Sequence, residues 1–370
     1  MHAMVVRRQK TGYRRGKTGV VMPDPFDRPA SIPAFALFAL LPGLLLGAAC
    51  LWGGGWTWAA LVWIGGASQI VDTVLARGFA DPVHDAAPAA TDLLSVVLAL
   101  LHFLLLGAGL AALTGEGMGA VSRVALFLGL GMFFGQVSNS NAHELIHRGS
   151  RGLFRLGAAV YVTLLFGHHA SAHRLVHHRY VATAQDPNSA RFGESFWHFL
   201  PRALAGSFRA GLAAERALSA AKPGRPNPYA VWVGGGLACC LAAWLVFGWA
   251  GLGWYLGLCL YAQVQMMLAD YVQHYGLQRA RRADGRYEPV GPRHSWDAPH
   301  FLSSLMMVNA PRHSDHHAHP GRAYPGLRLQ RAAAPRPMLP YSLPVMAALA
   351  MLPRLWRRVM DPRVRRMREG

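Results

Sequence analysis

The chain has 370 residues, of which 52% are apolar and only 15% carry a charge, and its formal net charge is +19. This composition is too apolar and too poor in charge for an ordinary soluble domain. The basic charge does not indicate nucleic-acid binding either, because no soluble segment interleaves basic residues with aromatic ones.

Six long runs nearly free of charge account for the composition. A membrane-spanning helix needs about 20 mostly apolar residues, and most of these runs reach that length once neutral flanks are included. We therefore expect an all-α, polytopic membrane protein with six transmembrane helices. The alternative interpretation is a large soluble protein in which these helices are buried. The runs are 35–52, 56–70, 93–113, 124–137, 229–248 and 252–268.

The distribution of basic residues predicts the topology. Lys and Arg gather in the N-terminal arm, between the fourth and fifth runs, and after the sixth, whereas only Arg123 stands beside a short connection. The positive-inside rule then places both termini and both long segments on the cytoplasmic side of the inner (plasma) membrane. The predicted units are a basic arm (1–34), four transmembrane helices (35–141), a cytoplasmic segment (142–228), two more transmembrane helices (229–271) and a cytoplasmic segment with a basic tail (272–370).

The four cysteines, Cys50, Cys239, Cys240 and Cys259, all fall inside predicted spans and form no C-x-x-C pair. They are most simply small apolar packing residues. An iron–sulfur or rubredoxin-type electron carrier would need paired cysteines in a soluble segment, so we expect no such carrier to be fused to this chain.

Four histidine groups stand out: "HELIHR", "HRLVHH", "QHYG" and "RHSDHH". Spacings of three and four put imidazoles on one helix face, and neutral imidazole is a good ligand for iron, copper, nickel or zinc. The predicted topology puts all four groups on one side of the membrane, which favours a metal site over a solvated basic surface. The candidate ligands are His143, His147, His173, His177, His178, His274, His313, His316 and His317.

These segments, read as "HELIHR", "HRLVHHRYVATAQDPNSAR", "DYVQHYGL" and "RHSDHHAHP", resemble the integral-membrane alkane 1-monooxygenases, relatives of xylene monooxygenase and the membrane fatty-acid desaturases. The resemblance covers most of the chain. It implies that the nine histidines hold two non-haem iron ions in a cytoplasmic cap over the helix ends. It also implies dioxygen as co-substrate, hydroxylation of a terminal methyl group of an alkane or alkyl-aromatic, and a rubredoxin- or ferredoxin-type electron donor with its reductase.

The sequence departs from the family pattern at several positions. Ala172 and Gln273 stand where Glu is usual, Asp270 where Asn is common, and Ala310-Pro311 where Leu-Gln is usual. Acidic partners orient ligating imidazoles and tune the metal. The departures leave the nine histidines in place and weaken the assignment of an n-alkane as the substrate.

Other polar residues near the groups are candidates for supporting roles. Glu144, Asp186, Asp270 and Asp315 could accept an imidazole N–H, and His168 and His169 could support the site or bind metal directly. His102, in the middle of the third run, is expected to make a polar contact within the helix bundle or to line the substrate path.

Three functions remain open at this point. The first is a hydroxylase whose hydrocarbon substrate enters from the bilayer. The second is a desaturase or lipid hydroxylase with the same di-iron site, and the third is a non-enzymatic membrane metal-binding protein. The basic cytoplasmic face, including the tail 354–368, would suit an acidic electron donor or anionic membrane lipids.

Overall fold

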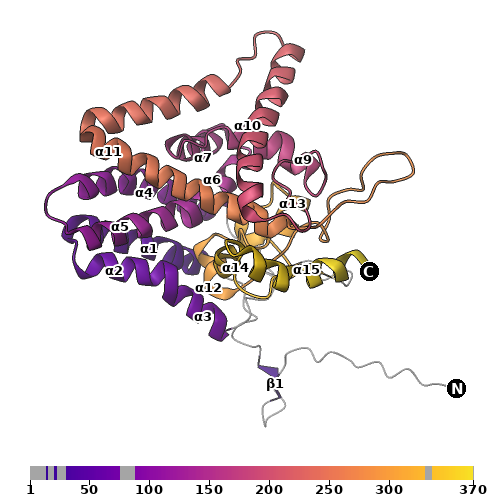
Figure 1. Ribbon diagram of the computed structural model, residues 1–370, viewed down its shortest axis with the longest axis horizontal. Helices are drawn as coiled ribbons and strands as arrows, with labels where there is room; N and C mark the ends of the chain where they lie inside the picture. The colour runs from indigo at the N-terminus through magenta and orange to yellow at the C-terminus, as the bar shows by residue number, and fades with distance from the viewer. Residues whose placement is uncertain (1–13, 16–20, 23–30, 76–87, 330–335, 370) are drawn as a thin grey trace.

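The computed structural model describes residues 14–15, 21–22, 31–75, 88–329 and 336–369 (Figure 1). Within these residues the protein is helical, and its one sheet pairs two short strands, β1 (Arg14–Arg15) and β2 (Val21–Met22). Of the predicted basic arm, 1–34, the structure describes only these two strands and residues 31–34. The prediction of an all-α protein is confirmed.

Four helices are long and apolar enough to cross a membrane: α1 (Ile32–Trp52), α4 (Pro88–Thr114), the stretch Ala120–Ile146, and α11 (Tyr229–His274). Many of their outward side chains are large and apolar, and Leu44, Leu104 and Val246 are 63%, 69% and 68% exposed. So extended an apolar surface suits contact with lipid rather than with water. The chain is therefore a membrane protein with four candidate spans in its described part.

The prediction of six spans differs from this count in two places. The second predicted span, 56–70, lies within a longer continuous helical run, whose polar residues Gln69 and Asp72 reduce its mean hydropathy. The fifth and sixth are the two limbs of α11, which bends at Gly248, where φ is 66° and ψ is −165°. The second run consists of α2 (Gly55–Val62), the π-helix η2 (Trp63–Ala67) and α3 (Ser68–Leu75).

Short turns join the apolar helices into hairpins. Gly53 and Gly54, with φ values of 60° and 53°, connect α1 to α2 in the left-handed region that favours glycine. Residues 115–119 connect α4 to α5 (Ala120–Phe133). Figure 1 shows these two turns and the bend of α11 at one end of the bundle, on the left in this view.

Of two further π-helices, one precedes the first predicted histidine group and the other contains part of the second. The π-helix η3 (Phe134–Ser138) joins α5 to α6 (Asn139–Ile146), and η4 (His173–His177) joins α8 (His169–Ala172) to α9 (His178–Tyr180). Single π-helical turns are rare and are frequent at functional sites, because they change which residues share a helix face.

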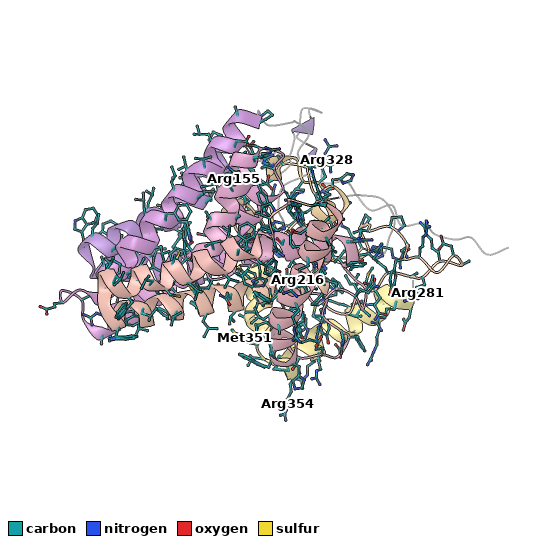
Figure 2. All side chains as sticks on the ribbon, turned by 90° about the horizontal axis from the view of Figure 1, so that it is seen from above. Arg155, Arg216, Arg281, Arg328, Met351 and Arg354 are labelled. Atoms are coloured by element: carbon teal, nitrogen blue, oxygen red, sulfur yellow. The ribbon has the colours of Figure 1, made fainter. Side chains whose placement is uncertain are left out.

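The remaining helices lie mainly at the end of the bundle opposite the three turns. Tyr271 and Tyr275 near the end of α11 pack against Trp356, with ring centroids 5.2 Å from it in each case. Figure 2 shows the labelled arginines around this half of the molecule. The remaining helices, which lie mainly at this end, are α7 (Arg151–Thr163), α10 (Phe196–Ala221), α12 (Phe301–Met306), α13 (His313–Ala318), η5 (Tyr324–Gly326), α14 (Leu343–Ala350) and α15 (Pro353–Glu369).

Candidate metal centre

The first two histidines lie at the end of α6, with His143 inside the helix and His147 as the residue that directly follows it. His143 and His147 are four residues apart, so they share a helix face, and their ring centroids are 5.1 Å apart. The hydroxyl of Tyr161 on α7 donates to the side-chain oxygen of Asn139 at 3.0 Å, which ties α7 to the first turn of α6. The site therefore begins on a helix end that is held by its neighbour.

The second group lies on η4 and the first residue of α9. The i→i+5 hydrogen bonds of a π-helix bring residues five apart close to one face. This explains how His178 approaches the same point as His173, with their Nε2 atoms 2.9 Å apart. His177 turns instead toward His274 and His317, whose ring centroids are each 4.8 Å from its own. One short segment thus contributes to both sides of the site.

The third and fourth groups come from two segments that meet at the end of the bundle. His274 is the last residue of α11, and its Nε2 lies 3.1 Å from the Nε2 of His313 on α13. His313 and His317 are four apart on α13, with their Nε2 atoms 3.0 Å apart. His316 points the other way, and its Nε2 lies 3.1 Å from that of His178.

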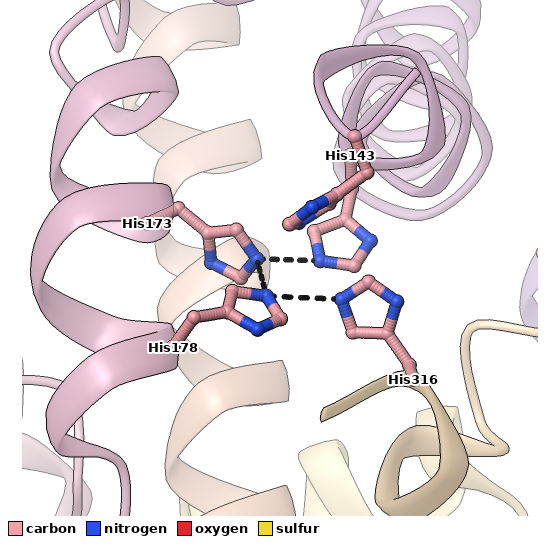
Figure 3. Close-up of side chains that lie close together, drawn as sticks. His143, His173, His178 and His316 are labelled. Carbon is pink, nitrogen blue, oxygen red and sulfur yellow. Dashed lines mark hydrogen bonds between the residues drawn. The ribbon is translucent and has the colours of Figure 1, made fainter. Parts of the chain in front are cut away.

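The structure therefore brings all nine candidate ligands together, in two groups. In each group the candidate ligand atoms lie within 4.8 Å of one another. Figure 3 shows part of the first group, with His143, His173, His178 and His316 pointing toward one another from three separate segments. The first group is His143, His147, His173, His178 and His316, and the second is His177, His274, His313 and His317.

Burial keeps most of these imidazoles neutral. Loss of hydration, reinforced by neighbouring histidines, lowers the pKa of six of them well below the usual 6.5. Neutral imidazole has a free nitrogen lone pair, which is the form that binds a metal. The six are His147, His173, His178, His313, His316 and His317.

Two buried nitrogen atoms show that the groups fit a metal ion. Among the described residues, Nε2 of His147 and Nε2 of His177 have no hydrogen-bond partner. Leaving a buried polar atom unpaired costs about 1–3 kcal/mol. A metal ion in each group would accept the lone pair of such an atom, and the all-imidazole donor set suits a transition metal such as iron.

Asp186 orients one of these imidazoles. Its Oδ2 accepts a hydrogen bond from Nδ1 of His177 at 2.9 Å, and Ser189 donates to the same oxygen at 2.7 Å. Burial alone would lower the pKa of His177, but the carboxylate outweighs it and the pKa is raised above 6.5. The pairing fixes the tautomer in which the His177 Nε2 lone pair faces the second group.

The three other candidate carboxylates make hydrogen bonds and ion pairs with residues that surround the site. Glu144 accepts from the backbone N–H of Tyr324 at 3.1 Å and pairs with Arg148 at 3.3 Å. Asp270 accepts from the side-chain amide of Asn188 at 2.6 Å. Asp315 accepts from the backbone N–H of Arg328 and pairs with His319 and Arg322. These contacts tie the helices that carry the histidines to the segments around them.

His168 and His169 are both buried, in different surroundings. The ring of His168 packs edge-on against Phe166 and Phe208. His169 lies nearer the site, with its ring centroid 4.9 Å from that of His173 and 4.9 Å from that of Tyr161. The structure therefore places His169, and not His168, beside the first group.

His102 lies in the interior of the bundle, away from the histidine groups. Its Nε2 is 2.9 Å from the hydroxyl of Thr163, and its ring packs against Phe134 with centroids 4.9 Å apart. This is the polar contact within the bundle that the sequence predicts.

The packing of α10 explains one of the unusual residues. Ala172 is buried, and a Cβ added to Gly211 on α10 would lie 2.9 Å from the Cβ of Ala172. So close an approach of the two helices leaves no room for a carboxylate at position 172. At the other unusual position, the Gln273 amide donates to the backbone oxygen of Ala310 at 3.2 Å, joining α11 to the residues before α13.

Asp297 supports the site but was not anticipated from the sequence. Its carboxylate accepts from the backbone N–H and the hydroxyl of Ser314, at 2.9 and 2.6 Å, and from Arg336 at 3.0 Å. Ser314 is next to His313, so Asp297 fixes the first turn of α13. Asp297 precedes its partner by 17 residues with no recognisable motif, and no local sequence pattern signals this contact.

Two cavities approach the site. A small one of about 40 Å³ is lined by His143, His169, His173 and His313. A larger one of about 300 Å³ lies between η2, η3, α11 and α14, and its walls include Ile64, Met132 and Val264. The two cavities share the lining residues Ala269, Met307 and Leu343. A largely apolar cavity thus lies next to the cavity that the histidines line.

The chain is similar to known proteins over most of its length. The model of the fatty acid desaturase family matches residues 119–349. Alkane 1-monooxygenase 2 of Pseudomonas aeruginosa is 32% identical over 321 residues, which are 84% of each chain. The alkane 1-monooxygenase of Ectopseudomonas oleovorans is 32% identical, covering 85% of this chain and 79% of the relative. Alkane 1-monooxygenase 1 of Pseudomonas aeruginosa is 35% identical, covering 67% of this chain and 65% of the relative.

The fold and the site define a class of protein, a helical membrane protein with two clustered histidine groups at one end of its helices. The chain belongs to the fatty acid desaturase family, in its alkane 1-monooxygenase branch. The predicted family and the prediction of an oxygen-inserting oxidoreductase are confirmed. The alternative of a non-enzymatic metal-binding protein is set aside.

Proposed function

We propose that this protein binds one iron ion in each histidine group and hydroxylates an unactivated C–H bond of a hydrocarbon. The observation that carries this proposal is the convergence of nine imidazoles in two groups beside an apolar cavity. When bound, the two irons would supply the oxidant, made from dioxygen and two external electrons. The cysteines are not expected to be ligands, since all four lie within the apolar helices α1 and α11.

The protein's own residues would position the ions and keep water from them. The second-group histidines are buried, and Asp186 and Asp297 fix the segments that carry His177 and His313. Preorganised ligands on helix ends hold a metal in one geometry, and a dry site limits side reactions. The supporting contacts of Glu144, Asp270 and Asp315 would serve the same end.

We propose that the substrate is an alkane or an alkyl-aromatic whose terminal methyl group reaches the site from the bilayer. The cavity between η2, η3, α11 and α14 supports this route, because its walls are largely apolar and it shares the lining residues Ala269, Met307 and Leu343 with the histidine cavity. An apolar chain lying in this space would point its end toward the histidines without crossing water.

For the topology, we propose six crossings, with both termini and the histidine groups on the cytoplasmic side of the inner membrane. The two limbs of α11 and the helical run from α2 to α3 would add to the spans already counted. The basic residues at the histidine end support this orientation through the positive-inside rule. The predicted units, with their boundaries at 34, 141, 228 and 271, follow from the same arrangement.

We propose a separate, acidic electron carrier of the rubredoxin or ferredoxin type. The four cysteines lie in apolar helices, whereas α15 has seven arginines that an acidic protein could approach. Opposite charge speeds such an encounter.

A desaturase or lipid hydroxylase is the second candidate function, favoured by the name of the matching family model.

One experiment distinguishes a hydrocarbon hydroxylase from a desaturase. Membranes containing the protein, supplied with NAD(P)H, a reductase and a rubredoxin, are given medium-chain alkanes, alkyl-aromatics and acyl lipids under labelled dioxygen. We expect a primary alcohol with one labelled oxygen. A new double bond in an acyl chain without retained oxygen would assign the protein to the desaturases, and an alcohol whose oxygen is unlabelled, and so comes from water, would contradict the proposal.

A further inference from the structure

A cavity of about 960 Å³ lies apart from the histidines, between α7, the end of α10 and the first limb of α11. We call it the α7–α11 cavity. Its walls are largely apolar and include Ala159, Val162 and Trp232. None of the nine candidate ligands is among the described residues that line it, so it is separate from the proposed active site.

One end of the α7–α11 cavity is basic. Four arginines line it, Arg151 and Arg155 on α7, Arg174 on η4 and Arg225 before α11, against the single carboxylate of Glu215. Four positive charges and one negative give the lining a net charge of +3. Neither Arg151 nor Arg155 has a carboxylate within ion-pair distance in the part of the chain that the structure describes. The basic end is therefore not neutralised by the protein itself.

The one carboxylate in the lining is already occupied. Glu215 pairs with Arg225 at 2.7 Å and accepts from the hydroxyl of Ser171 at 2.7 Å, and Trp232 donates to that hydroxyl at 3.0 Å. Arg225 retains a buried Nη1 with no hydrogen-bond partner among the described residues. An anion at this end of the cavity would give that donor an acceptor.

The cavity opens beside a helix that faces lipid. In the first limb of α11, Val231 and Leu237 are 62% and 65% exposed. Arg151 follows His147 by only four residues, so the basic end lies toward the histidine end of the bundle. The apolar end reaches Val162 and Gly235, farther along α7 and α11. The cavity thus has the polarity of a lipid molecule, charged at one end and apolar along its length.

We propose that the α7–α11 cavity binds one anionic phospholipid, with its phosphate at Arg151, Arg155 and Arg225 and an acyl chain along α7 and the first limb of α11. Guanidinium groups match phosphate oxygens through paired hydrogen bonds, and their charge selects an anionic headgroup over a zwitterionic one. The proposal does not depend on the proposed function, because it rests on residues that take no part in metal binding.

The test uses the full protein in phosphatidylcholine nanodiscs with increasing amounts of phosphatidylglycerol brominated on its acyl chains. Bromine quenches a tryptophan that it contacts, and the difference between the natural protein and Trp232→Phe isolates the signal of Trp232. We expect brominated phosphatidylglycerol to quench Trp232 at a lower mole fraction than brominated phosphatidylcholine does. Arg151→Gln with Arg155→Gln should raise that mole fraction by roughly fivefold per arginine removed.

The matched control is Arg216→Gln with Arg354→Gln, which removes the same charge outside the cavity; Figure 2 shows Arg354 on the opposite side of the molecule from Arg155. It should leave the preference unchanged. Ala159→Phe, which fills the cavity, should reduce quenching by both lipids, whereas Ala238→Phe on the exposed face of α11 should not.

Three results would overturn the proposal. The first is equal quenching by the two brominated lipids, which would indicate ordinary surrounding lipid. The second is stronger quenching by a brominated fatty acid than by the phospholipid. The third is a Trp232 that no brominated lipid reaches while Val231→Cys cross-links two chains, which would show that a second copy covers the cavity.

Discussion

Nδ1 of His177 donates to Oδ2 of Asp186 across 2.9 Å, and both side chains are almost completely buried. A buried carboxylate in this position holds the imidazole in one tautomer and one orientation, so that Nε2 faces the second histidine group. The contact joins η4 to the loop after α9, because Asp186 follows His177 by nine residues. Its consequence for metal binding can be measured directly.

Replacing Asp186 by Asn should weaken iron binding without unfolding the protein. The amide keeps the shape of the side chain and loses its charge, and loss of such a partner typically costs 10–100-fold in metal affinity. The measurement is iron retained by the purified protein under competition with a chelator. Asp284→Asn, in an exposed turn, is the matched control. If the iron affinity of the Asp186 variant equalled that of the control, Asp186 would have no role in orienting a ligand.

Replacing His143, His177 or His316 by Ala should lower the bound iron and abolish hydroxylation, because each change leaves a vacancy in one of the two groups. His102→Phe should retain the iron, since His102 contacts Thr163 within the bundle and lies in neither group. Metal analysis and activity on the same preparations check both statements. Full iron content in all three alanine variants would show that the ligand assignment is wrong.

Asp72 should matter for stability rather than for chemistry. Its carboxylate accepts the backbone N–H groups of Leu302 and Ser303, at 2.6 and 3.0 Å, and so joins α3 to the first turn of α12. Asp72→Ala would leave two buried donors unpaired, at about 1–3 kcal/mol for each. We expect a lower midpoint of thermal unfolding in detergent. Thr73→Ala, next to it and exposed, should have little effect, and equal midpoints for the two variants would contradict this role.

The sequence predicts those parts of the structure that depend on neighbouring residues. The apolar runs predict the helices, and the spacing of His143 and His147 predicts their common face, because both patterns repeat within a few residues. Whether α11 forms one straight helix or two limbs depends on a single glycine, Gly248, and the sequence does not reveal the backbone conformation of that residue.

The division of the histidines into two groups depends on contacts between distant segments. His316 joins His178, and His274 joins His313, across separations of 138 and 39 residues. The π-helical turn that separates His177 from its neighbours has no sequence signature of its own. Ala172 likewise has a reason only once α10 is seen to pack against it.

The last prediction concerns the route of the substrate. Ala269 lines both the apolar cavity and the histidine cavity, so a larger side chain at this position would fill the space where the proposed substrate route passes from one to the other. Ala269→Phe should therefore retain its iron and lose most of its turnover of hydrocarbons, because the methyl group can no longer reach the metal site. Activity and bound iron are measured together, with Ala238→Phe on the exposed face of α11 as the matched control. Unchanged turnover in Ala269→Phe with full iron would mean that substrate reaches the histidines by another path, and loss of iron would mean that Ala269 supports the ligands instead.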